Sequence, residues 1–194
     1  MRMLGERAIA PQRTLRKAVG CRGIGLHCGE PVTMMLRPAA PDSGIVFRRS
    51  DAGVEIRADW RNSVESALST VLSNREGVQV ATVEHLLAAL AGNRIDNALV
   101  ELDGPEVPIM DGSAAPFVRL IQSVGSAIQN APRHAIKIIK PVQVAENGSS
   151  AALLPDPEFS MSFEIDFDSP LIRQQRISLS IDADAFNEIG RAHV

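Results

Sequence analysis

The residues Thr82-Val83-Glu84-His85-Leu86-Leu87-Ala88-Ala89-Leu90-Ala91 form the strongest helix signal in this sequence of 194 residues. Thr82 is a suitable N-cap, and the following Gly92-Asn93 is typical of a helix end. A short run with strand character, Ala98-Leu99-Val100-Glu101-Leu102, comes directly after it. A helix beside a strand predicts a mixture of helix and sheet rather than a helical bundle or an all-β fold.

Further signals lie on both sides of this helix, strands before it and a second helix after it. Before it lie three short apolar or alternating runs, separated by turn-forming residues in a β-meander pattern. These runs cover residues 33–36, 44–47 and 54–56. After it, a second helix is expected near residues 114–124, with Asp111 or Ser113 as its cap and Gly125 as its end. We therefore predict a first α+β domain over residues 12–131, preceded by a disordered tail over residues 1–11.

The pattern breaks around Asn130-Ala131-Pro132-Arg133 and then restarts as sheet. Residues 135–144 lead into Asn147-Gly148, a strong hairpin signal. The run 159–167 alternates apolar and polar residues and predicts a half-buried strand. A helix capped by Asp182 or Asp184 would follow. One short helix at a chain end covers little of a sheet, so the second domain, residues 132–194, is expected to be incomplete. The predicted fold is a two-domain layered sheet/helix sandwich of the α+β class.

The composition is that of an ordinary soluble globular protein, with 45% apolar and 22% charged residues. A net charge of −3 offers no basic field for nucleic acid or an anionic membrane. No apolar run is long enough to span a bilayer, and the start lacks the apolar core of a secretory signal. A cytoplasmic protein without stable membrane insertion is expected. Cys21 and Cys28 do not have the spacing of a redox or metal motif, and we expect two reduced thiols.

The pair Glu84-His85 is the first candidate for chemistry. Both residues lie in the first turn of the expected helix, whose positive end favours a carboxylate and a neutral imidazole. Those are the forms that accept a proton and bind a metal. A catalytic zinc needs three protein ligands, and no H-x-x-x-H or H-x-x-x-D helical pair is present to complete a site with His85. The alternative is structural: Glu84 as a capping aid and His85 as a hydrogen-bonded core residue.

Two further segments have structural and functional interpretations. The glycine-dense run Gly23-Ile24-Gly25-Leu26-His27-Cys28-Gly29 predicts a sharp loop between strands, in which His27 could line a cleft. In the run 106–113, capping of the next helix by Asp111 or Ser113 is favoured over catalysis. The motif G-x-S-x-G is absent, which leaves a serine hydrolase unsupported.

Several motifs in order resemble those of the UDP-3-O-acyl-N-acetylglucosamine deacetylase family, from Gln12 to about Ala192. They are Gln12-Arg13-Thr14-Leu15, Gly25-Leu26-His27, Gly44-Ile45-Val46-Phe47-Arg48-Arg49, Thr82-Val83-Glu84-His85-Leu86, Gly92-Asn93-Arg94-Ile95-Asp96-Asn97 and Pro108-Ile109-Met110-Asp111-Gly112-Ser113-Ala114. The resemblance implies two similar α+β domains with the active site between them. It also implies one zinc ion per chain and hydrolysis of the N-acetyl amide of a UDP-linked acyl-glucosamine in lipid A biosynthesis.

The resemblance assigns roles residue by residue. Glu84 corresponds to the general base and His85 to the first zinc ligand. His27 corresponds to a histidine that can hold a second, inhibitory metal. Leu68 and Ser69 fall on the strand beside the substrate passage.

In the family, a histidine and an aspartate four residues apart on a later helix complete the zinc site, and a later threonine stabilises the oxyanion. None of these occurs in this chain. We therefore expect it to be the N-terminal part of the enzyme, inactive by itself and monomeric.

Two other classes of function are alternatives. One is a non-catalytic α+β binding module that kept the fold and lost the site. The other is a phosphate-handling enzyme such as a small-molecule kinase. A kinase would need a glycine-rich phosphate loop that opens a helix, and the sequence contains none.

Overall fold

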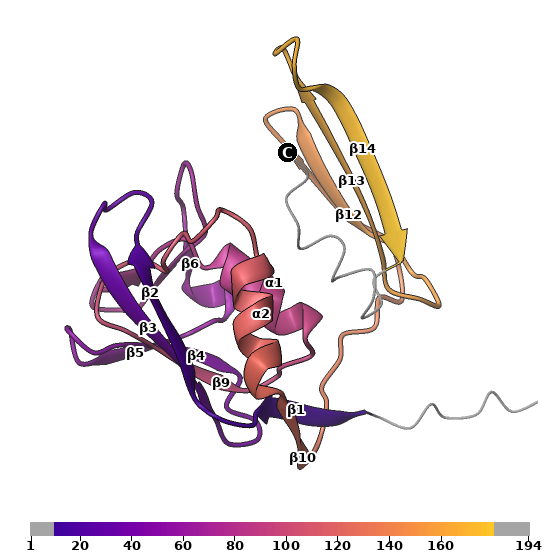
Figure 1. The fold of residues 1–194 in the computed structure, drawn as a ribbon. Coiled ribbons are helices and arrows are strands. Elements are labelled where there is room, and N and C mark those ends of the chain that lie inside the picture. Colours follow the sequence, from indigo (N-terminus) through magenta and orange to yellow (C-terminus); the bar gives the residue numbers. More distant parts are fainter. Residues whose placement is uncertain (1–9, 181–194) are drawn as a thin grey trace, which may run out of the picture. The chain divides into compact units, whose positions relative to one another are not determined.

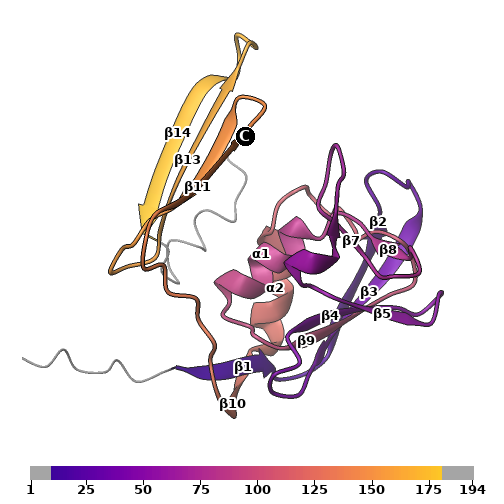
Figure 2. The ribbon, with the colours of Figure 1, turned by 180° about the vertical axis from the view of Figure 1, so that it is seen from behind.

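The computed structural model describes residues 10–180, which divide into two compact units. The first unit ends at Arg133 and the second begins at His134. Figures 1 and 2 show both units from opposite sides. Each unit is described by itself. Both contain sheet, and the first also contains helices, which confirms the predicted α+β class.

The first unit is built on a five-stranded sheet in the order β2-β3-β9-β4-β5. The strands are β2 (Val19–Ile24), β3 (Pro31–Pro38), β4 (Ile45–Arg49), β5 (Val54–Arg57) and β9 (Ala98–Leu102). β9 pairs antiparallel with β3 and parallel with β4. The strands β3, β4, β5 and β9 correspond to the four runs that the sequence predicted. β9 is the central strand of the five, and its residues Ala98, Val100 and Leu102 are all fully buried.

Two helices cover one face of this sheet, α1 (Glu84–Gly92) and α2 (Ala115–Val124) (Figure 1). Alternate residues of the strands point toward them, and the apolar stripe of each helix points back. The fully buried side chains of this core include Met34, Leu36, Phe47, Leu86, Val100 and Phe117. Burial of this apolar surface is the main favourable contribution to the stability of the unit.

Smaller elements frame the sheet. A short 3-10 helix, η1 (Trp60–Asn62), leads into a three-stranded sheet of β6 (Ser63–Val64), β7 (Val71–Ser73) and β8 (Gln79–Val80), visible in Figure 2. β1 (Pro11–Leu15) pairs antiparallel with β10 (Ser126–Pro132), a strand that the sequence did not predict. β10 crosses the domain boundary expected after residue 131, and that boundary stays a prediction.

The helix ends differ in part from expectation. Thr82 is not the N-cap of α1: Val83 holds that position, and Thr82 has a positive φ of 57°. The physical reason is a long-range bond, because the Thr82 hydroxyl donates to Glu106 at 2.6 Å instead of capping the helix. Neither Asp111 nor Ser113 is the N-cap of α2, because the helix begins at Ala115 with Ala114 at that position. The hydroxyl of Ser113 still accepts the N–H of Ala115 at 3.2 Å. Gly125 ends α2 with a φ of 69°, as predicted.

The second unit consists of two hairpins. β11 (Val142–Glu146) pairs with β12 (Ser149–Leu153), and β13 (Ser160–Phe167) pairs with β14 (Arg173–Ser180). The turn at Asn147-Gly148 is confirmed, and both of its residues have positive φ, as a tight hairpin turn requires. The strand expected over 135–144 begins only at Val142, because Pro141 lacks the N–H that a ladder needs.

Three of the four apolar residues of β13 are more exposed than predicted, and only Ile165 is partly buried. Met161, Phe163 and Phe167 are 52%, 60% and 54% exposed. No residue between His134 and Ser180 is buried. The strand itself is correctly predicted, but no described residue of the second unit covers its apolar face. The helix expected after Asp182 lies outside them. None of the helices in the described part is long and apolar enough to cross a membrane.

Candidate functional site

Glu84 is the first residue of α1, and its carboxylate is held by the chain that precedes β7. The N–H of Thr70 donates to Glu84 Oε2 at 3.0 Å, and the N–H of Val83 donates to the Thr70 carbonyl at 3.3 Å. The carboxylate therefore contacts another segment rather than capping its own helix. Neighbouring His85 is half-buried in the same turn.

Leu68 and Ser69 lie in the loop between β6 and β7, not on a strand as expected. The strand begins only at Val71, because Thr70 is bonded to the start of α1 rather than to a neighbouring strand. Because Thr70 is bonded to Glu84, Leu68 and Ser69, which directly precede Thr70, lie near Glu84.

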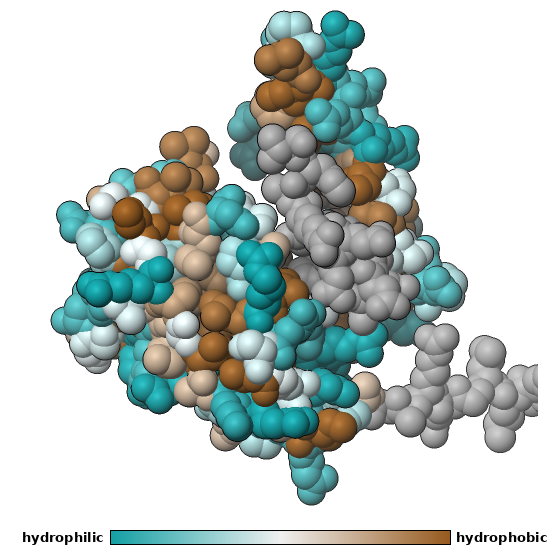
Figure 3. Space-filling view, viewed as in Figure 1, coloured by the Kyte–Doolittle hydropathy of each residue, from teal (hydrophilic) through white to brown (hydrophobic). Residues whose placement is uncertain are grey.

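The loop carries exposed apolar surface. Leu68 is 79% exposed, while Leu26 and Ile24 in and beside the turn after β2 are 57% and 55% exposed. Figure 3 shows apolar surface over the β6–β7 loop and near the β2–β3 turn. Side chains of this kind suit contact with an apolar ligand or with more protein.

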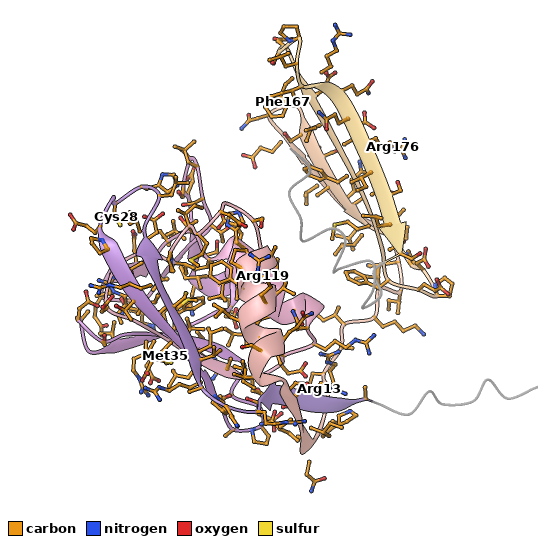
Figure 4. All side chains as sticks on the ribbon, in the orientation of Figure 1. Arg13, Cys28, Met35, Arg119, Phe167 and Arg176 are labelled. Atoms are coloured by element: carbon orange, nitrogen blue, oxygen red, sulfur yellow. The ribbon has the colours of Figure 1, made fainter. Side chains whose placement is uncertain are left out.

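His27 lies in the tight turn between β2 and β3, and its side chain is exposed. The turn closes through two backbone bonds, from Gly25 N–H to the Glu30 carbonyl and from Gly29 N–H to the Gly25 carbonyl, both 3.0 Å. A Cβ on Gly25 would lie 2.3 Å from Cys28 Sγ, so this position requires glycine. The predicted sharp loop is confirmed. Figure 4 labels Cys28 at its tip, and Cys28 and Cys21 are both free thiols.

Glu106 is a residue of this region that the sequence reasoning did not single out. It is 1% exposed, and its carboxylate accepts four hydrogen bonds. His27 N–H bonds to both oxygens at 3.1 and 3.0 Å, Cys28 N–H donates at 2.9 Å, and the Thr82 hydroxyl donates at 2.6 Å. Burial alone would raise the pKa of Glu106, but the bonds from Thr82, Cys28 and His27 bring that pKa below its ordinary value.

Glu106 connects the loop of His27 to the residues that precede Glu84. It joins segments that are 79 and 24 residues away in sequence. The only local signal was a charged residue inside the apolar stretch Pro105-Glu106-Val107-Pro108, where burial of a charge needs several donors. Through Thr70 and Glu106, the structure links all the segments that carry the predicted site residues.

The residues of this region do not complete a zinc site by themselves. Among residues 10–180, no group of three or more His, Cys, Asp or Glu side chains is placed to hold a metal ion. His85 can supply one ligand, and His134 belongs to the second unit. His193 lies outside the described residues. A catalytic zinc needs three protein ligands, so further ligands would have to come from elsewhere in the protein.

The sequence was compared with known protein families, and one family accounts for nearly all of it. The sequence model of UDP-3-O-acyl N-acetylglycosamine deacetylase, LpxC, matches residues 12–193. This chain belongs to the UDP-3-O-acyl N-acetylglycosamine deacetylase family. The family resemblance drawn from the sequence motifs is therefore confirmed.

Individual deacetylases of this family support the same assignment. A UDP-3-O-acyl-N-acetylglucosamine deacetylase of Myxococcus xanthus is 52% identical over 184 residues, which are 93% of this chain and 58% of that protein. The proteins of the same name from Pseudomonas entomophila and Vibrio parahaemolyticus are 50% and 48% identical over 186 residues. These cover 93% of this chain and 61% of each relative. The chain thus spans about three-fifths of the length of these deacetylases.

Proposed function

We propose that this chain carries the general base and one zinc ligand of a UDP-3-O-acyl-N-acetylglucosamine deacetylase. The observation that carries the proposal is the place of Glu84-His85 in the first turn of α1, within a chain of this family. Glu84 is the base and His85 the ligand. The reaction would release acetate from the N-acetyl amide, a step in lipid A biosynthesis.

The position of Glu84 suits proton transfer. An amide is a poor electrophile, and zinc supplies the Lewis acid that its hydrolysis needs. The Thr70 N–H holds the carboxylate of Glu84 at the start of α1, and a carboxylate so placed is a group that can accept a proton from the attacking water. One carboxylate oxygen, Oε2, is engaged by Thr70. We assign the other oxygen, Oε1, to the reacting water.

The surroundings of Glu84 suit a substrate with an apolar tail. Leu68 and Ser69 are held next to Glu84 through Thr70, and Leu68 is among the most exposed apolar residues of the first unit. We assign both residues to substrate contact, with Leu68 against the acyl chain. His27, on the neighbouring turn, is assigned to a second and inhibitory metal.

The remaining ligands would come from a part of the protein that this chain does not contain. With one ligand of the three needed, the chain alone should neither hold zinc tightly nor turn over substrate. The whole enzyme is proposed to act as a cytoplasmic monomer. The lack of a three-ligand group among residues 10–180 also fits a second candidate, a non-catalytic binding module of the same fold. A His-x-x-x-Asp helix encoded beyond Val194 would favour the enzyme.

Substitution of Glu84 tests the proposal. The chain is extended with the remaining length of the Myxococcus xanthus relative, and Glu84→Gln is compared with His85→Ala. Gln keeps the size and a hydrogen-bonding oxygen but accepts no proton, so kcat should fall by roughly 10²–10⁴-fold with zinc content near one. His85→Ala should lose zinc as well as rate.

The matched control is Glu55→Gln, which removes an exposed carboxylate of β5 and should leave kcat unchanged. If Glu84→Gln keeps more than about a tenth of the activity, Glu84 is not the base. A helix-stabilising role of Glu84 would instead lower the melting temperature and leave turnover nearly normal.

A further inference from the structure

Glu106 is the one buried carboxylate of the described residues that joins two separate segments of the candidate site. Its bonds to His27 and Cys28 hold the β2–β3 turn, and its bond to Thr82 holds the chain just before α1. It touches neither Glu84 nor His85 through any of these bonds. Its place on the segment after β9 is itself fixed, because Val107 N–H donates to the Ala81 carbonyl at 3.1 Å.

The pocket around this side chain is built for a carboxylate and not for an amide. A carboxylate accepts only, and the groups that meet it are two backbone N–H groups and a hydroxyl that donate. A glutamine would offer one accepting oxygen in place of two, so its NH₂ group would face either a backbone N–H or the Thr82 hydroxyl, which would then have to turn from donor to acceptor. The fit on the side of the turn is close, since a Cβ on Gly25 would lie 2.6 Å from Glu106 Oε2.

Thr82 shows why the bond to Glu106 matters at the start of α1. Its φ of 57° is uncommon for a β-branched residue, so the surrounding structure must hold it there. Backbone bonds of Ala81 and Val83 hold the chain on both sides of Thr82, and the bond of its hydroxyl to Glu106 is the side-chain contact that holds Thr82 itself. Because Thr82 is followed by Val83, which caps α1, this conformation sets where the first turn of the helix begins.

We propose that Glu106 is a positioning residue that locks the His27 turn and the start of α1 together, so that His27 and the Glu84-His85 pair are held as one preformed unit. The proposal rests on the proposed function for its catalytic consequence, but its structural part concerns only this chain. Glu106 acts through Thr82 and the turn, and it does not itself touch the reacting atoms.

Amide hydrogen exchange in the 194-residue chain tests the structural part. In Glu106→Gln, exchange at His27 and Cys28 should accelerate by roughly tenfold to a hundredfold, the range expected when hydrogen bonds to a charged group are lost. Thr70 N–H, which is bonded to Glu84, should accelerate too. Exchange in β9 should not change. Asp103→Asn is the matched control, because it removes an exposed carboxylate that accepts a backbone N–H, that of Thr33, on the same segment. Faster exchange at His27 alone, with Thr70 unchanged, would overturn the coupling.

A pair of variants at Thr82 separates positioning from packing and does not require Glu106→Gln to fold. Thr82→Ser keeps the hydroxyl that donates to Glu106, and Thr82→Val keeps the shape but loses the donor. If the bond to Glu106 positions both segments, Thr82→Ser should resemble the wild type and Thr82→Val should accelerate exchange at both Thr70 and His27. The opposite order would show that only the methyl group matters and would overturn the proposal.

The extended enzyme gives the catalytic readout. Thr82→Val should lower kcat by about tenfold or more, with zinc content unchanged and KM changed less than kcat, since misplacing a catalytic group costs rate before binding. Unchanged kcat in Thr82→Val would overturn the catalytic part. Glu84→Gln in the same protein distinguishes this failure from failure of the proposed function: if Glu84→Gln is also fully active, the base assignment is wrong and the exchange coupling still stands.

Discussion

β3 in the first unit and β13 in the second are strands of eight residues with the same alternation of apolar and polar side chains. In β3, Val32, Met34 and Leu36 are 2%, 0% and 0% exposed. In β13, Met161 and Phe163 are 52% and 60% exposed. Alternation determines which face of a strand is apolar, but burial requires a second layer. The two helices supply that layer for β3, and the second unit has no helix between His134 and Ser180.

Two phenylalanines give the strongest test of this contrast. Phe117 of α2 is fully buried, and Phe163 of β13 is mostly exposed. Phe117→Ala should lower the free energy of unfolding of the first unit by about 3–5 kcal/mol, through lost transfer energy and a cavity. Phe163→Ala should change stability by less than about 0.5 kcal/mol, as is usual at the surface. Urea unfolding of both variants measures the difference, and equal losses would show that β13 is covered in solution.

Hydrogen exchange sharpens the same contrast without substitution. The amides of β9 lie in the centre of the five-stranded sheet, so they should open only with the whole first unit. The amides of β13 belong to a two-stranded sheet with an exposed apolar face and should exchange faster. Val100 and Ile165 are the residues to compare by NMR. Similar protection at both would mean that the second unit is as stable as the first.

The pH dependence of stability should also differ between the units. The pKa of buried Glu106 is lowered by its hydrogen-bond donors, so its ionised form stabilises the folded state. That stability is fully present above the ordinary pKa of a glutamate, about 4.3, and is lost as the pH falls through the lower folded value. Glu106→Gln should flatten the acid limb of the stability curve of the first unit. Measuring the acid limb for the wild type and for Glu106→Gln by urea unfolding checks this, and an equally steep limb in both would show that Glu106 does not cause it.

Much of the first unit could be predicted because its signals are local. The helices α1 and α2 and the strands β3, β4, β5 and β9 each have a periodicity that one window of sequence contains. β10 had no such signal: Ser126-Ala127-Ile128-Gln129-Asn130 is mostly polar, and it is a strand because β1 pairs with it from the other end of the unit.

In the candidate site too, local features could be predicted and contacts between distant segments could not. The sequence located Glu84-His85 in the first turn of a helix, which the structure confirms. It placed Thr82 at the cap and overlooked Glu106, because the bond between these two side chains crosses 24 residues. The family resemblance placed Leu68 and Ser69 on a strand, and no local signal reveals that Thr70 bonds to the helix start.

The smallest expected effect concerns ion pairs, one cluster in the first unit and one pair in the second. Glu101 of β9 bridges Arg37 of β3 and Arg48 of β4, whereas Glu164 meets Arg176 across one hairpin at 3.9 Å. Glu101→Gln should cost about 0.2–1 kcal/mol, because exposed ion pairs contribute little and two partners are lost. Glu164→Gln should cost nothing measurable. Thermal unfolding at low and high salt measures both, and a loss for Glu101→Gln that salt does not reduce would rule out an electrostatic origin.

The pairing of β1 with β10 has a consequence for the order of events on the ribosome. Leu15 pairs with Ser126, so the first strand to emerge must wait for more than 100 further residues before its partner exists. At about 5–20 residues per second, that delay lasts from several seconds to some twenty seconds. The five-stranded sheet and both helices are synthesised within that interval. Closure of β1 onto β10 is therefore the last pairing that chain growth permits in this unit.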